Sequence, residues 1–261
     1  MCTLVVDYLP GARVPVLLAA VRDEFVDREW VAPGAHWPAY PGLIGGRDLL
    51  AGGTWLAVDP AARRAGCVLN GRGAMADADS RRSRGDLPLH AAASQGPLGE
   101  AADRGEAAGS AGGLGVGGAL SPYDPFHLVR ADTGGVELLS WDGHTATRQE
   151  IGPGTHVVVN TGLDPNEPRA ARFCPRFAGA ARPDPGPGDA PEAAWKPWLP
   201  LVEGDGLPPD DPAALIVRRA HTTGLLYGST SITLVALAAD GVRYDFCGDP
   251  AHPSWTTILP G

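Results

Sequence analysis

The sequence predicts an α+β fold in which antiparallel strands form two groups, with helical segments between and after them. Short apolar runs rich in β-branched residues are separated by Pro, Gly and Asp-Gly breaks, which is typical of β-hairpins. Two further segments begin with Pro and are long enough for helices. We expect strands over residues 2–8, 15–21, 51–58, 65–69, 125–131, 136–141, 145–151, 156–160, 229–237 and 242–246, and helices over 168–177 and 212–220.

The length of 261 residues allows one substantial core, and we expect a single domain over residues 1–261. Two low-complexity insertions should interrupt it, at about residues 91–120 and 178–194. The first is rich in Gly, Ala and Ser and has almost no large apolar residue, so it should be a mobile insertion.

The composition argues against several classes of protein. A net charge of −9 and a pI of about 5.2 disfavour nucleic acid and anionic membrane surfaces as partners. No apolar run is long enough to span a bilayer, and the N-terminus lacks the pattern of a signal peptide, so we expect a cytoplasmic protein. The 4 cysteines and 7 histidines are scattered without metal-ligand spacing, so we expect no metal site.

The predicted first hairpin gives the strongest indication of function. A turn centred near Gly11 and Ala12 places Cys2 opposite Val21, within a register error of about 2 residues. Arg22 and Asp23 would then emerge beside the sulfur atom of Cys2. The hairpin therefore predicts a thiol, a guanidinium and a carboxylate at one end of a sheet.

Cys2 becomes the N-terminal residue if Met1 is removed, because Cys is small enough to permit that removal. Its free α-amine, with a reference pKa of about 7.7–8, is a base that can activate its own thiol. Arg22 should lower the thiol pKa, and Asp23 should accept hydrogen bonds from the amine. The alternative is that Cys2 is only a small buried apolar residue.

Two asparagines lie at predicted strand ends, where an amide can stabilise an oxyanion. Pairing Trp55 with Val68 returns Asn70 beside Gly53, whose N–H could serve as a second donor. Asn160 ends another predicted strand. A tight turn at the glycines, and a turn cap at Asn160, are the structural alternatives.

Several different motifs follow one another along the chain, and the first is Met1-Cys2-Thr3. The others are segments 17–25, 45–48, 52–58, 69–72, 123–128, 153–156 with Asn160, and 227–231. Together they resemble the NRDE family, also called the transport-and-Golgi-organisation-2-like family. The resemblance covers most of the chain apart from the insertions. One departure is plain, because Val21 stands where the family motif usually has Asn.

The resemblance implies an N-terminal-nucleophile hydrolase-like fold, an αββα sandwich of two stacked antiparallel sheets flanked by helices. It is similar in plan to penicillin and bile-salt amidases that start with Cys, in which an Arg and an Asp of the second strand hold the nucleophile. The catalytic residues it implies here are Cys2, Arg22, Asp23, Asn70 and Asn160. The ligand-binding residues it implies are Glu24, Gly53, Trp55 and Arg72.

The function implied is cleavage of a small amide or thioester through Cys2 after removal of Met1, with no cofactor. The partner would be a small acyl or amide substrate. The alternative is a non-catalytic carrier of haem or of an acyl-CoA or lipid in the same pocket. Cys2, a histidine or the Cys174-Pro175 pair would then be the candidate ligands of haem iron.

Overall fold

The computed structural model describes residues 2–94, 96 and 120–261. The chain divides into two compact units, and each is a sheet with helices against it. Unit 1 comprises Met1–Arg28 and Gly152–Gly261, and unit 2 comprises Glu29–Ile151. Helices packed on antiparallel sheets confirm the predicted α+β class.

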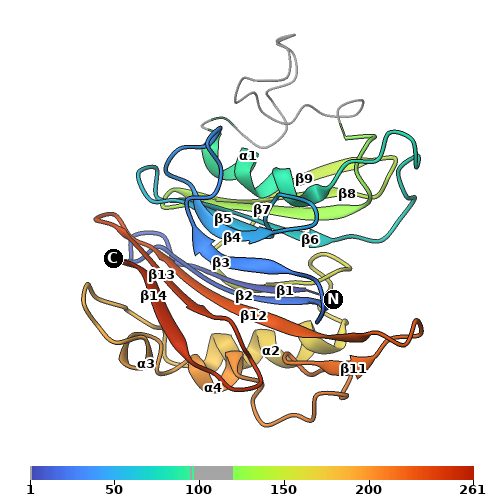
Figure 1. Ribbon diagram of the computed structural model, residues 1–261. Coiled ribbons are helices and arrows are strands. Elements are labelled where there is room, and N and C mark those ends of the chain that lie inside the picture. Colours follow the sequence, from blue (N-terminus) through green and yellow to red (C-terminus); the bar gives the residue numbers. More distant parts are fainter. Residues whose placement is uncertain (1, 95, 97–119) are drawn as a thin grey trace. The chain divides into compact units, whose positions relative to one another are not determined.

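Unit 1 contains a 7-stranded antiparallel sheet in the order β10-β1-β2-β12-β13-β14, with β11 paired to β12 (Figure 1). Its strands are β1 (Thr3–Tyr8), β2 (Val16–Phe25), β10 (Gly154–Val158), β11 (Arg218–Ala220), β12 (Leu226–Leu237), β13 (Val242–Cys247) and β14 (Trp255–Pro260). Its helices are α2 (Pro168–Gly179), α3 (Pro191–Ala194) and α4 (Leu199–Val202).

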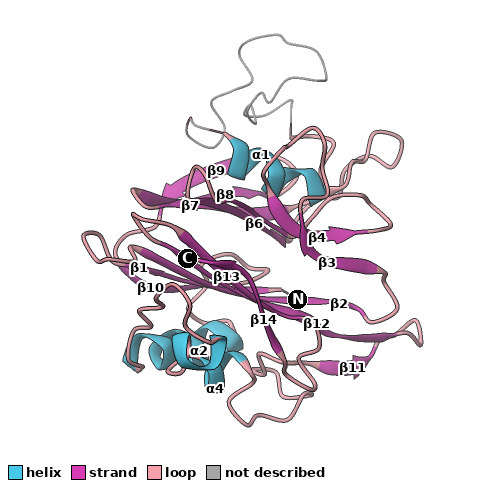
Figure 2. Cartoon of the chain, turned by 60° about the vertical axis from the view of Figure 1, so that its left-hand side comes forward, coloured by secondary structure: helices cyan, strands magenta, loops and turns pink. Residues whose placement is uncertain are grey.

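The helices of unit 1 lie on one face of its sheet (Figure 2). Alternate residues of the strands, such as Val5 and Val21, point to that face and join Phe173 of α2 in one buried core. Trp195, directly after α3, and Trp198, directly before α4, are fully buried in the same core. Aromatic packing therefore fixes the helices on the sheet that carries Cys2.

Unit 2 contains a second 7-stranded antiparallel sheet, in the order β3-β4-β5-β6-β7-β8-β9. Its strands are β3 (Trp30–Gly34), β4 (Ile44–Asp48), β5 (Leu56–Asp59), β6 (Arg64–Asn70), β7 (Phe126–Asp132), β8 (Gly135–Trp141) and β9 (Ala146–Glu150). A 3-10 turn, Arg84–Asp86, leads into α1 (Leu87–Ala93), which packs on β5 and β6.

Two predicted elements are wrong. Residues 156–160 do not continue the meander of β7, β8 and β9, because β10 leaves that sheet and pairs with β1. Ile151, Gly152 and Pro153 separate β9 from β10, whose first residue, Gly154, has a φ of +116°. The expected helix over 212–220 is also absent: β11 forms at its end, because Arg218–Ala220 pair with Leu226–Gly228.

The boundaries of the predicted insertions also move. Ala91, Ala92 and Ala93 complete α1, and Leu120 is buried, while residues 95 and 97–119 lie outside the described part of the chain. Within the second insertion, Arg243 donates hydrogen bonds to the carbonyl oxygens of Gly186 and Asp189 at 2.9 and 2.6 Å. That segment is therefore held to β13.

Candidate active site at the N-terminal strand

Cys2 lies directly before β1, at the end of the unit 1 sheet. The predicted hairpin is confirmed, but its register is shifted by one residue, since Thr3 rather than Cys2 pairs with Val21. The shift arises because the connection runs from Leu9 to Pro15 and is closed by a Leu9 N to Pro15 O hydrogen bond of 2.8 Å. Continued by one residue, the register sets Cys2 opposite Arg22.

The Cys2 thiol is half-buried and donates a hydrogen bond to the backbone oxygen of Asp23, with an Sγ–O distance of 3.7 Å. The same oxygen accepts a hydrogen bond from the Tyr227 hydroxyl at 2.9 Å. Tyr227 belongs to β12, the neighbour of β2 on its other side. The carbonyl of Asp23 thus links the thiol to two strands of the sheet.

Arg22 is almost fully buried on β2. Its Nη1 donates a hydrogen bond to the Thr230 hydroxyl at 2.8 Å, and its Nη2 lies 3.9 Å from a carboxylate oxygen of Glu24. Thr230 is the extra residue of a β-bulge in β12, between Ser229 and Ser231. The bulge re-aims the Thr230 hydroxyl toward the guanidinium, which is a common use of bulges near functional sites.

The Asp23 carboxylate points to the helix side of the sheet, where Arg169 of α2 meets it. Arg169 Nη1 lies 2.7 Å from Asp23 Oδ2 and 3.0 Å from the Thr3 hydroxyl, and the exposed fractions of the two charged side chains are 1% and 0%. The Ser229 hydroxyl donates a second hydrogen bond to the carboxylate, 2.6 Å long, at Asp23 Oδ1. Because both charges are buried and Arg169 Nη1 lies 2.7 Å from the carboxylate, the pair fixes the end of β2 against α2.

Arg169, Tyr227 and Ser229 are the residues of this cluster to which sequence reasoning gave no role. The segment 227–231 and the helix starting at Pro168 were both recognised, but nothing in them indicated a contact with Asp23. The signal available in the sequence is spacing: Arg169 lies four and eight residues before Phe173 and Phe177, so a helix starting at Pro168 places it on their apolar face.

Glu24 and Asn160 complete the set of predicted site residues in unit 1. Glu24 Oε2 lies 3.9 Å from both Arg22 and Arg28. The β1–β10 register, which pairs Leu4 with Val158, brings Asn160 to the level of Cys2 when continued. Asn160 begins a two-residue turn closed by hydrogen bonds between Val159 and Gly162.

Arg22 lowers the pKa of the Cys2 thiol, as expected, but its contribution does not set the direction of the net shift. Burial raises the pKa of the Cys2 thiol above its ordinary value, and this effect outweighs the lowering by nearby positive charge, to which Arg22 contributes. The thiol is therefore neutral at pH 7, and it needs a base before it can act as a nucleophile.

We expect alkylation of Cys2 by iodoacetamide to be half-maximal at a higher pH in the folded chain than in the urea-unfolded chain, where the value is about 8.5. Because the folded thiol keeps its proton longer, its contribution to stability is full below the ordinary pKa and falls as the pH rises through the folded pKa. Peptide-mapped mass spectrometry across a pH series measures the midpoint. A folded-state midpoint below that of the unfolded chain would contradict the burial argument.

The other predicted site residues, Gly53, Trp55, Asn70 and Arg72, belong to unit 2. Trp55 is buried and packs edge-to-face on Trp30, with ring centroids 5.9 Å apart. Its predicted pairing with Val68 is confirmed by a Val68 N to Trp55 O hydrogen bond of 2.9 Å. Asn70 ends β6 as an exposed residue opposite Phe126, and Arg72 follows in the loop.

Gly53 serves close packing. A Cβ atom at Gly53 would lie 2.3 Å from the backbone carbon of Gly85, and the carbonyl oxygen of Gly53 accepts a hydrogen bond from Asp48 N. Gly52, with a φ of +77°, completes the turn. The tight-turn alternative therefore describes these glycines.

Gly53→Ala is expected to lower the free energy of unfolding by about 1–3 kcal/mol, because the new methyl group would overlap rigid backbone. Gly135→Ala is the matched control, since a Cβ atom there would meet nothing within 4 Å. Urea denaturation measures both. Equal stability of the two variants would contradict the close approach to Gly85.

Within the described residues, no group of three or more His, Cys, Asp or Glu side chains is placed to hold a metal ion. The helices of this part of the chain are all too short or too polar to cross a membrane.

A family model described as Transport and Golgi organisation 2 matches residues 1–183. Among solved structures, the mutant C2A conjugated bile acid hydrolase from Clostridium perfringens is similar, with a TM-score of 0.47 and 10% sequence identity over 99% of this chain and 96% of that chain. No curated protein matches the chain. The family match covers more than half of the chain and includes Cys2, Arg22 and Asp23.

Proposed function

The chain belongs to the Transport and Golgi organisation 2 family, and from this premise and the contacts of Cys2 we propose that it hydrolyses a small amide or thioester. The nucleophile is the Cys2 thiol, with the α-amine freed by removal of Met1 as its base. The observation that carries the proposal is the Cys2 thiol 3.7 Å from the Asp23 carbonyl, next to the buried Arg169–Asp23 pair.

The raised pKa of the thiol fits an amine-assisted attack better than a preformed thiolate. The amine takes the thiol proton as sulfur bonds to the carbonyl carbon, which gives a tetrahedral oxyanion. The protonated amine then gives its proton to the leaving nitrogen or sulfur as the bond to carbon breaks. A thioester of Cys2 remains.

Water completes the reaction. The neutral amine takes a proton from a water molecule while the water oxygen attacks the thioester carbon. The second tetrahedral intermediate then expels the Cys2 sulfur, which regains a proton from the amine. The free acid leaves, and the enzyme returns to its starting state. Asn160, at the level of Cys2 by register, is our candidate oxyanion donor, and the family resemblance adds Asn70.

Arg22 and Asp23 act in this proposal as positioning residues. Asp23 holds the strand end through Arg169 and Ser229, and Arg22 is fixed by Thr230. We include hydrogen bonds from the α-amine to the Asp23 carboxylate as part of the proposal. The proposal also includes ligand contacts by Glu24 and Arg72, and a cytoplasmic location. Gly53 and Trp55, the other two predicted ligand-binding residues, are already engaged in packing.

The second candidate function is the carriage of haem, and one observation bears on it. His156 and Cys174 line a single cavity, so an imidazole and a thiol are available there. Burial raises the pKa of the Cys174 thiol, which disfavours the thiolate that iron requires. Its wall residues also include no Lys or Arg to pair with the carboxylates of haem, so these walls do not fit that group.

The test of the hydrolase proposal is turnover of hexanoyl-4-nitroanilide and an S-hexanoyl thioester by the mature full-length chain. A variant with Lys inserted between Met1 and Cys2 is the matched control, because its cysteine has no free α-amine. The wild type should release the leaving group and the insertion variant should not, at similar thermal stability. No release by the wild type, or equal release by both, would refute the amine-assisted mechanism.

A further inference from the structure

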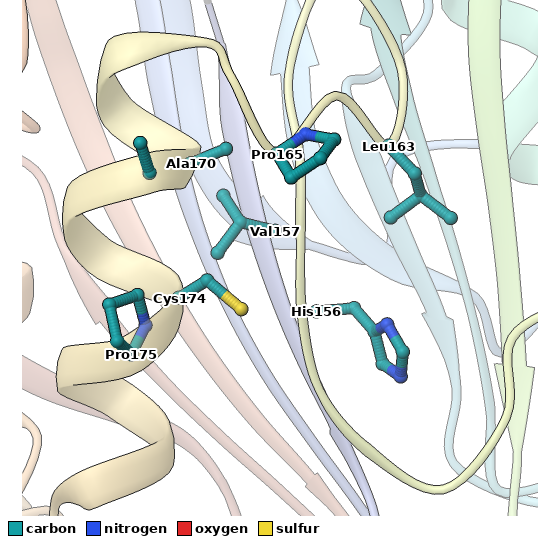
Figure 3. A pocket seen from close by; sticks show the side chains of 8 residues that line it. His156, Val157, Leu163, Pro165, Ala170, Cys174 and Pro175 are labelled. Carbon is teal, nitrogen blue, oxygen red and sulfur yellow. The ribbon is translucent and has the colours of Figure 1, made fainter.

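A cavity of about 430 Å³ lies at the open edge of the unit 1 sheet (Figure 3). Edge strand β10, the following loop and helix α2 each provide part of its wall. The lining residues are His156, Val157, Leu163, Pro165, Ala170, Ala171, Cys174 and Pro175. Its volume is within the range of about 300–1,000 Å³ that is usual for small-molecule sites.

The walls determine what charge a ligand can carry. Most of the lining is hydrocarbon from Val157, Leu163, two prolines and two alanines, and none of the lining residues is acidic or carries a lysine or arginine. An ion bound there would lose hydration without gaining an opposite charge. An uncharged, mainly apolar molecule loses little and gains the burial of its surface.

The two polar side chains of the wall already donate hydrogen bonds to backbone oxygens of the protein. They can therefore only accept a hydrogen bond from a ligand. The Cys174 thiol donates to the carbonyl oxygen of Thr155, with an Sγ–O distance of 3.3 Å. The His156 ring donates from Nε2 to the carbonyl oxygen of Gly152 at 3.0 Å, so Nδ1 of the neutral ring is an acceptor.

A third acceptor comes from the backbone of α2. Pro175 lies inside the helix and has no N–H, so the regular hydrogen bond from position 175 to the carbonyl oxygen of Ala171 is absent. Both residues line the cavity. A carbonyl without its helical donor favours a ligand that brings a hydroxyl or N–H.

We propose that this cavity is a binding site for a small, uncharged, apolar molecule that carries one hydroxyl group. The hydrocarbon walls hold its apolar part, and one of the acceptors at Ala171, Cys174 and His156 accepts the hydrogen bond of the hydroxyl. The site is separate from the chemistry at Cys2 and does not depend on hydrolysis. Ala170, next to Arg169, places the cavity beside the residue that holds Asp23.

The probe for the test is 1-naphthol, compared with 1-methoxynaphthalene, which has no donor, and 1-naphthoate, which is charged. Equilibrium dialysis against the full chain gives each Kd. We expect 1-naphthol to bind about tenfold more tightly than the methoxy compound, as one hydrogen bond predicts, and 1-naphthoate to bind more weakly than both.

The second measurement is protection of Cys174 from N-ethylmaleimide, mapped by mass spectrometry with Cys2, which is also half-buried, as the internal reference. At about ten times its Kd, 1-naphthol should slow Cys174 alkylation about tenfold, because only the free fraction reacts. Ala171→Leu fills the cavity and should abolish both binding and protection. Ala178→Leu, on an exposed part of the same helix, is the matched control and should change neither.

The outcomes are distinct. Absence of 1-naphthol binding in dialysis overturns the site, whether or not Cys174 reacts. Unchanged binding by the Ala171→Leu variant overturns its location. Equal affinity for 1-naphthol and 1-methoxynaphthalene overturns the proposed recognition of a hydroxyl.

Discussion

Arg169→Met is expected to lower the free energy of unfolding by about 3–5 kcal/mol, the cost of leaving one partner of a buried ion pair uncompensated. The Asp23 carboxylate is completely buried, and Arg169 Nη1 lies 2.7 Å from its Oδ2. Methionine fills a similar volume but brings no charge. Urea denaturation followed by tryptophan fluorescence measures the change.

Arg176→Met is the matched control on the same helix. Arg176 is 45% exposed in its ion pair with Asp205, so its loss should cost less than about 1 kcal/mol. The double variant Asp23→Asn with Arg169→Met should be less destabilised than the sum of the single changes, because neither charge is then left alone. Equal stabilities of the Arg169→Met and Arg176→Met variants would contradict a structural role for the buried pair.

Cys2→Ala is expected to reduce hydrolysis of the hexanoyl substrates by at least about a thousandfold, since loss of a nucleophile removes the covalent route. The fold should be little affected, because Cys2 is only half-buried and precedes β1. Cys174→Ala is the matched control and should retain hydrolysis. Steady-state rates and thermal unfolding of the three proteins provide the comparison.

Comparable rates for the Cys2→Ala variant and the wild type would remove Cys2 from the mechanism. Loss of hydrolysis in the Cys174→Ala variant alone would assign the chemistry to the cavity of α2 instead. The thermal unfolding curves separate either result from a failure to fold.

The first hairpin could be predicted from the sequence because its determinants are local. Two β-branched runs flank a Pro-Gly turn, so the approach of Cys2 to Asp23 followed to within one residue of register. The strand pairs β5–β6 and β12–β13 were found for the same reason. Local turns and apolar alternation specify register wherever strands are neighbours in the chain.

The missed features depend on contacts between distant segments. Asp23 and Arg169 are 146 residues apart, and no local pattern connects them. The strand β10 follows a meander in sequence, yet it pairs with β1 across more than a hundred residues. Arg22 was expected to lower the thiol pKa, but burial of the thiol by the folded chain has the larger effect.

The central claim is a nucleophilic thiol on the first residue of the mature chain, and peptide mass spectrometry after brief incubation with the S-hexanoyl thioester tests it most directly. The account predicts an N-terminal peptide that lacks Met1 and carries one hexanoyl group on Cys2, with Cys67, Cys174 and Cys247 unmodified. Retention of Met1 in active protein, or hexanoyl groups on another cysteine with none on Cys2, would contradict it.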